Sequence, residues 1–100
     1  MSIYIDALMA CTPTPGWPYS RACHMFVAPG EVEKLHAFAQ AMGIPRRSFQ
    51  PRPDLPHYDL NAEFRALALA RGAVEVDRRF VVGMLYRWRE SIALPPPAQG

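Results

Sequence analysis

The positions of the eleven prolines constrain the fold of this 100-residue chain more than any other feature. Proline fixes φ and has no backbone N–H to donate, so helix interiors and central strands exclude it. Ten prolines gather in the segments 12–18, 45–56 and 95–97, and Pro29 stands alone. The regular elements must fit between these breaks, which predicts one small domain built from short strands and helices.

Between the breaks, the sequence predicts strands and helices in the order β-β-α-loop-α-β-α. Residues 2–8 alternate apolar and polar side chains, which is the period of a strand, and three other segments repeat apolar residues at spacings of three and four, which is the period of a helix. The predicted strands cover residues 2–8, 21–28 and 73–76, and the predicted helices cover residues 31–42, 62–71 and 78–92.

The ends of the predicted helices carry residues that favour helix termini. Asn61 and Asp77 precede the second and third helices as N-caps, and Gly43 and Gly72 follow the first and second as stops. The side chains expected to face the core are Val32, Leu35, Phe38, Ala39 and Met42 in the first helix, Phe64, Leu67 and Ala68 in the second, and Val81, Met84, Leu85, Trp88 and Ile92 in the third.

These elements predict a small α/β or α+β domain over residues 1–94 with a three-stranded mixed sheet. The first two strands pair antiparallel through the loop at 12–18, and the third joins them by a right-handed crossover. Residues 95–100 are predicted to form a disordered tail.

The composition is that of a globular protein with a core of limited size. Half of the residues are hydrophobic and a fifth are charged. A chain of this length buries roughly two-thirds of its unfolded surface, so we expect a homodimer that covers further apolar surface contributed by Trp17, Phe26 and Trp88. Cys11 and Cys23 form neither a disulfide framework nor a complete metal site. With no signal peptide and no apolar span, we expect a cytoplasmic protein without membrane contact.

The positive charge is concentrated in the second part of the chain. Nine of the eleven basic residues lie from Arg46 onward and all nine are arginine, which gives that part a net charge of +3 against −1 before it. Arginine suits phosphates and carboxylates. The excess is too small for bulk nucleic-acid binding, and no helix-turn-helix pattern precedes the last helix, so DNA is not the expected partner.

The segment from Arg46 to Leu60 concentrates polar and aromatic groups at the junction of two helical patterns. Such loops carry binding and catalytic groups more often than other segments. Candidates for recognising an anion or a base edge are Arg46, Arg47, Gln50 and Arg65. Candidates for stacking on a ring are Phe49, Tyr58 and Trp17. The full set of predicted ligand-binding residues is Asp6, His24, Arg46, Phe49, Gln50, His57, Tyr58, Asp59 and Arg65. We expect all of them except Arg65 to meet at one pocket, with Asp6 and Arg46 at its wall.

Several short motifs, in a fixed order, make the chain similar to a known family. They are Tyr4-Ile5-Asp6, Cys23-His24-Met25, Leu35-His36-Ala37-Phe38-Ala39, the run from Gly43 to Gln50, His57-Tyr58-Asp59-Leu60, Arg65-Ala66 and Ala70-Arg71-Gly72-Ala73. From about Ser2 to Val76 the chain resembles the small bacterial and phage proteins of domain-of-unknown-function family 4031. The resemblance implies where the site lies and a cytosolic, often phage-encoded setting, but it implies no reaction.

The histidines allow either a catalytic or a metal-binding interpretation. In an extended segment His57 and Asp59 point to the same side, where the carboxylate can orient the imidazole as a general base. His24, His36 and His57 are also weaker candidates for a divalent metal, although none shows paired ligand spacing, so no cofactor is expected. Ser20, Ser48 and Cys23 lie in no recognisable nucleophile motif.

The leading hypothesis is therefore a binding module rather than an enzyme. Its ligand would be a phosphorylated or nucleotide-derived molecule, and a phage protein of this kind would sequester a host defence signal. The alternative is a small hydrolase or nuclease in which His57 and Asp59 activate water, with or without a metal.

Overall fold

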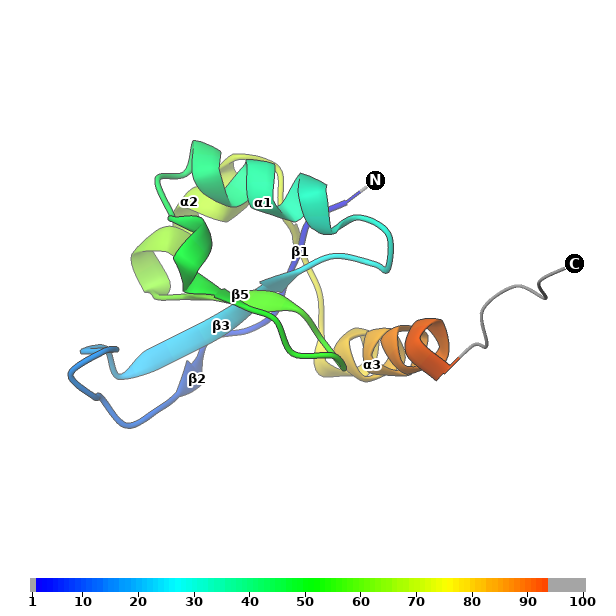
Figure 1. Ribbon diagram of the computed structural model, residues 1–100. Helices are drawn as coiled ribbons and strands as arrows, with labels where there is room; N and C mark the ends of the chain where they lie inside the picture. Colours follow the sequence, from blue (N-terminus) through cyan, green and yellow to red (C-terminus); the bar gives the residue numbers. More distant parts are fainter. Residues whose placement is uncertain (1, 94–100) are drawn as a thin grey trace, which may run out of the picture.

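A computed structural model describes residues 2–93 as a mixed sheet with helices on both faces (Figure 1). The predicted tail at 95–100 lies outside the described residues. The strands are β1 (Tyr4–Ile5), β2 (Met9–Ala10), β3 (Arg21–Phe26), β4 (Phe49–Gln50), β5 (His57–Leu60) and β6 (Val74–Glu75), and the helices are α1 (Val32–Ala41), α2 (Ala62–Ala70) and α3 (Arg78–Ala93), with a short 3-10 turn η1 (Arg46–Ser48) before β4.

The sheet has the order β4-β5-β3-β1-β6, and β2 pairs with β3 beside β1. All pairs are antiparallel except β1 with β6, which is parallel. The mixed α/β class, the three helices and the antiparallel pairing of the first two predicted strands are confirmed. The prediction of three strands is wrong, because the described residues form six.

Two of the missed strands, β4 and β5, form a hairpin whose connection is rich in proline, a composition that predicts a loop. Pro51, Pro53 and Pro56 fall in the connection between β4 and β5, so they remove no donor from the ladder that pairs Phe49 with Tyr58 and Gln50 with His57. The third missed strand, β2, is only two exposed residues long. The helix termini follow the predicted rules: Asn61 and Asp77 accept hydrogen bonds from the backbone of Phe64 and Phe80, each at 2.9 Å.

Strand alternation gives the sheet two different faces. Ile5, Met25 and Leu60 point to the face that α1 and α2 cover, and they are almost fully buried. The opposite face carries His24, Phe26, His57 and Asp59. Figure 1 shows α1 and α2 on one side of the sheet and α3 on the other.

Helix α3 is held against the second face by aromatic side chains. Trp88 is 9% exposed, and its indole Nε1–H donates to the carbonyl of Val27 at 2.9 Å. The ring of Phe80 lies 4.6 Å from that of Tyr4 on β1. Met84 is buried as predicted, but Ile92 is 58% exposed, since the helix extends past the sheet.

Two further packing expectations are corrected. Leu67, predicted to face the core, is 36% exposed, because α2 turns Phe64, Ala68 and Leu69 toward the core instead. Phe26 and Trp88, on which the homodimer argument relied, are buried within the monomer. The homodimer stays a prediction. No helix among residues 2–93 is long and apolar enough to cross a membrane.

We expect Trp88→Ala to lower the free energy of unfolding by about 3–5 kcal/mol, because it leaves a cavity between α3 and the sheet and an unpaired Val27 carbonyl. Urea denaturation followed by circular dichroism measures this change. Tyr86→Ala is the matched control, since Tyr86 lies on the same helix but is 61% exposed, and its effect should stay within about 0.5 kcal/mol. Equal effects of the two substitutions would show that Trp88 does not anchor the helix.

Candidate functional site

The pairing of β3 with β5 brings two histidines and a carboxylate together on the α3-facing side of the sheet. His24 on β3 lies directly opposite Asp59 on β5, and His57 lies two residues before Asp59 on the same strand. Because side chains alternate along a strand, all three point to one face. The rings of His24 and His57 are 4.8 Å apart, centroid to centroid.

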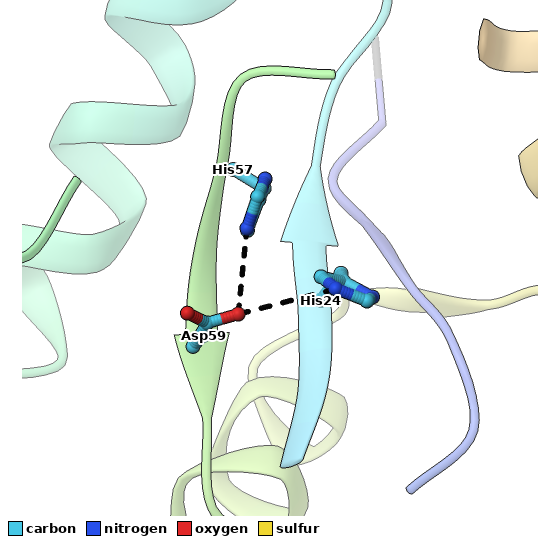
Figure 2. Close-up of side chains that lie close together, drawn as sticks. All are labelled: His24, His57 and Asp59. Carbon is cyan, nitrogen blue, oxygen red and sulfur yellow. Dashed lines mark ion pairs between the residues drawn. The ribbon is translucent and has the colours of Figure 1, made fainter. Parts of the chain in front are cut away.

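One oxygen of Asp59 faces both imidazoles (Figure 2). Asp59 Oδ1 lies 3.4 Å from His57 Nε2 and 4.0 Å from His24 Nε2. One ligand atom from each of the three residues lies within 4.8 Å of the other two. His57 is buried, whereas His24 and Asp59 are partly exposed and give solvent access to the cluster.

The other nitrogen of each imidazole is already engaged by an oxygen acceptor. His24 Nδ1 lies 2.8 Å from Asp6 Oδ2, and His57 Nδ1 lies 2.6 Å from the carbonyl of Leu55. A carbonyl only accepts, and the Asp6 carboxylate also only accepts, so Nδ1 carries the hydrogen in both rings. Asp6 is fixed in turn, since its Oδ1 accepts from the backbone N–H of His24 at 2.6 Å.

This hydrogen bonding leaves three electron-pair donors pointing at one another. In the neutral tautomers, both Nε2 atoms present a lone pair toward the Asp59 carboxylate. Such an arrangement needs a positive charge at its centre, either a proton on an imidazole or a metal ion. The pKa values agree: the hydrogen bond to Asp6 raises the pKa of His24 despite its burial, and the hydrogen bond from His57 lowers the pKa of Asp59.

The geometry of the cluster suits a divalent metal ion. Two imidazoles and a carboxylate form the protein ligand set of many catalytic zinc and non-haem iron sites. Donor atoms about 2.1 Å from a tetrahedral ion lie roughly 3.4 Å from one another. The His57–Asp59 separation is 3.4 Å, the His24–Asp59 separation is 4.0 Å, and all three ligand atoms lie within 4.8 Å of one another, so the histidines must draw closer to Asp59 and to each other to reach this spacing. The Nδ1–H bonds to Asp6 and Leu55 are the outer-shell contacts that orient metal-binding histidines.

The cluster opens into a pocket of about 580 Å³ between the sheet and α3. Helix α3 supplies an apolar wall from Val81, Val82 and Leu85. The remaining apolar lining is Ala7, Met9 and Leu55, and the polar lining is Asp6, His24, Gln50, Arg52, Asp54, His57, Asp59 and Arg78. We name this space the cluster pocket.

Two guanidinium groups belong to the cluster pocket. Arg52 lies 3.7 Å from Asp54 in an exposed ion pair, and Arg78 at the start of α3 belongs to none of the ion pairs among residues 2–93. Arginine side chains at the wall of a pocket that contains the His24–His57–Asp59 cluster favour an anionic ligand.

The expectation that Phe49 and Tyr58 line the same pocket as His24 is wrong. They pair across β4 and β5 on the α1-facing side, with ring centroids 5.4 Å apart. His36 on α1 joins them there, where its Nδ1 lies 2.7 Å from the Tyr58 hydroxyl. Burial lowers the pKa of His36 and raises that of Tyr58. His36 therefore lies outside the His24–His57–Asp59 cluster.

The structure places Arg46 and Arg65 away from the cluster pocket. Arg46 is exposed and pairs with Glu33 at 3.4 Å. Arg65 donates from Nε to the backbone carbonyl of Asp6 at 2.9 Å and also pairs with Glu75. It ties the end of β1 to α2 and β6, and so supports the residue that orients His24.

The cysteine beside the cluster has no reactive character. Burial, followed by the charge of Asp6, raises the pKa of Cys23 to about 12. The thiol therefore stays protonated at neutral pH, and a thiolate nucleophile is not formed.

Sequence reasoning missed the role of α3 and of the hairpin loop. Neither Arg52 nor Arg78 is among the predicted ligand-binding residues, although both line the cluster pocket. The spacing of Arg78, Val81, Val82 and Leu85 does place them on one side of a helix. This pattern was visible in the sequence, but which sheet face it covers depends on the chain path.

Comparison with known proteins identifies the family. The family described as "Protein of unknown function (DUF4031)" matches residues 3–88. The chain therefore belongs to this family. The resemblance seen in the short motifs ends at about Val76, but the family match continues to Trp88 and so includes most of α3. No curated protein and no solved structure matches the chain.

We expect His24 in the metal-free protein to titrate above its ordinary pKa of 6.5, and Asp6→Asn to lower that pKa. NMR titration of the imidazole signals, with a chelator present, measures both. Because the folded pKa is raised, protonation of His24 stabilises the fold. This stabilisation is fully present below about pH 6.5 and is lost as the pH rises through the folded pKa.

His36 provides the internal control for this titration, since burial shifts its pKa in the opposite direction. A pKa of His24 at or below 6.5, or one that Asp6→Asn leaves unchanged, would contradict the hydrogen bonding described for the cluster.

Proposed function

We propose that this protein is a small metal-dependent hydrolase that acts on a phosphorylated small molecule. The observation that carries the proposal is the convergence of His24 Nε2, His57 Nε2 and Asp59 Oδ1, each imidazole held by a hydrogen bond on its other nitrogen. We therefore prefer the hydrolase, which is the alternative hypothesis from the sequence, to the binding module, which is the leading one. Binding an anion does not require two oriented imidazoles and a carboxylate, whereas metal-dependent hydrolysis does.

The residues of the cluster pocket have three roles: some bind the metal ion, one orients a metal ligand, and others bind the substrate. His24, His57 and Asp59 are the ligands, and Asp6 is a positioning residue that acts through His24. With a divalent ion held by these residues, the cluster would supply Lewis-acid polarisation of a phosphoryl oxygen and a more acidic water. Arg52 and Arg78 bind the negative charge of the phosphoryl group.

The proposed hydrolysis balances with water as the only co-reactant. The oxygen of water forms a bond to phosphorus, and the bond between phosphorus and the leaving oxygen breaks. The proton lost by the attacking water passes to solvent, which reaches the cluster beside the partly exposed Asp59 and His24. The leaving oxygen takes a proton from the same solvent.

Binding without turnover is a second candidate. It is favoured by Arg78 at the pocket wall, which forms no ion pair within residues 2–93, and by the exposed Gln50, which together suit capture of a phosphorylated ligand. A phage protein that sequesters a signalling nucleotide would need only these contacts. The two candidates use the same pocket and differ in whether the bound molecule is released intact.

We expect the wild-type protein to bind Mn²⁺ or Zn²⁺ with one ion per chain, as isothermal titration calorimetry measures. Asp59→Asn removes a charged ligand and should weaken metal binding by more than roughly tenfold, and Asp6→Asn by about 10–100-fold through the loss of His24 orientation. Glu63→Gln is the matched control, because Glu63 is an exposed carboxylate in the first turn of α2, outside the cluster pocket. Metal binding that is equal in Asp59→Asn and Glu63→Gln would exclude this cluster as the metal site.

We expect the metal-loaded protein to release more than one equivalent of nitrophenol from p-nitrophenyl phosphate or bis(p-nitrophenyl) phosphate. His57→Ala should abolish this turnover, whereas Glu63→Gln should retain it. Absorbance at neutral pH follows the reaction, with excess chelator as the negative control. Stoichiometric binding of phosphate with no turnover for Mn²⁺, Zn²⁺ or Mg²⁺ would replace the hydrolase by the sequestering candidate.

A further inference from the structure

A second pocket adjoins the cluster pocket and has a different chemical character. It has a volume of about 470 Å³ and shares Gln50 and Asp59 with the cluster pocket. Its lining includes three aromatic side chains, Trp17, Tyr19 and Phe64. We name it the aromatic pocket. A ligand that passes Asp59 can therefore occupy both spaces at once.

The loop between β2 and β3 holds Trp17 in a fixed position. Trp17 and Thr14 exchange backbone hydrogen bonds of 2.9 and 3.0 Å, and Thr14 Oγ1 accepts a third from the Trp17 N–H at 3.0 Å. Pro15 and Pro18 stiffen the same turn. Tyr19 packs edge-on against the indole, with centroids 5.0 Å apart and planes at 75°. A rigid aromatic surface of this kind binds a planar ring at low entropic cost.

Polar groups beside the aromatic rings suit the edge of a heterocycle. The indole Nε1–H of Trp17 is buried without a hydrogen-bond partner among residues 2–93, so the ring presents its carbon face and edge, not this donor, to the pocket. Gln50 stands at the junction of the two pockets with an exposed amide, and Ser48 adds a hydroxyl. An amide offers a donor and an acceptor side by side, as a nucleobase edge requires.

We infer that the substrate is a nucleotide, with its phosphate at the His24–His57–Asp59 cluster and its base in the aromatic pocket. The inference rests on the proposed function for the position of the phosphate, but the position of the base rests on Trp17 and its neighbours alone. It assigns a role to the proline-rich loop at 12–19, which no catalytic step uses.

Isothermal titration calorimetry in the presence of Mn²⁺ tests the inference with three kinds of probe. These are the four common nucleoside 5′-monophosphates, ribose 5-phosphate, which has no base, and inorganic phosphate. We expect at least one nucleotide to bind on the order of tenfold or more tightly than ribose 5-phosphate, because stacking of one base contributes that much. Trp17→Ala should remove the preference for the nucleotide and leave the affinity for ribose 5-phosphate unchanged. Tyr86→Ala is the control and should keep the preference, because Tyr86 is an exposed aromatic residue outside both pockets.

The outcomes separate this inference from the proposed function. If the metal binds and nitrophenyl phosphates turn over, but no nucleotide exceeds ribose 5-phosphate, the nucleotide inference is overturned and the hydrolase stands. If a nucleotide binds through Trp17 although metal binding and turnover fail, the inference stands and the hydrolase falls. If Trp17→Ala does not fold, a Trp88→Phe variant leaves Trp17 as the single fluorescent tryptophan. Nucleotide that stacks on Trp17 should then quench its fluorescence. Fluorescence that nucleotide does not quench would overturn the inference.

Discussion

The antiparallel register between β3 and β5 is the constraint on which the rest of the molecule depends. It sets His24 opposite Asp59 and, on the reverse face, Met25 opposite Tyr58. A shift of one residue would turn His57 and Asp59 toward α1 and bring Tyr58 to the α3 side. The apolar face makes such a shift costly, because Met25 and Tyr58 are almost fully buried and each contributes roughly 1.5–3 kcal/mol by burial. The stability of the core therefore fixes the geometry of the polar cluster.

The polar cluster is tolerated beneath α3 because nearly all of its hydrogen-bonding groups have partners. Both oxygens of Asp6 accept hydrogen bonds from His24, and Nδ1 of His57 donates to the backbone of Leu55. The two Nε2 atoms face the Asp59 carboxylate instead, at 3.4 Å from His57 and 4.0 Å from His24. Their arrangement leaves one defined place for a cation, bordered by the apolar wall of α3.

Much of the fold follows from local sequence signals, whereas the site depends on long-range pairing. The caps at Asn61 and Asp77 and the periodicity of α1, α2 and α3 set the helices close to their predicted bounds. The alternation of His57 and Asp59 correctly placed them on one side of a strand. Phe49 and Tyr58 were misplaced, because a segment between prolines gave no sign that it forms a hairpin whose side chains divide between two faces. The contribution of Arg78 could not be foreseen, since no local pattern states which face of the sheet α3 covers.

The central claim is that His24, His57 and Asp59 hold one divalent ion. The most direct measurement is a crystal structure of the protein grown with Mn²⁺ or Zn²⁺, with anomalous scattering recorded at the metal edge. If these residues bind one ion, we expect a single anomalous peak about 2.0–2.2 Å from Nε2 of His24, Nε2 of His57 and a carboxylate oxygen of Asp59. We also expect that Nδ1 of His24 keeps its hydrogen bond to Asp6. A metal peak elsewhere, or an ordered cluster in which Asp59 binds two imidazolium rings with no ion between them, would contradict the account.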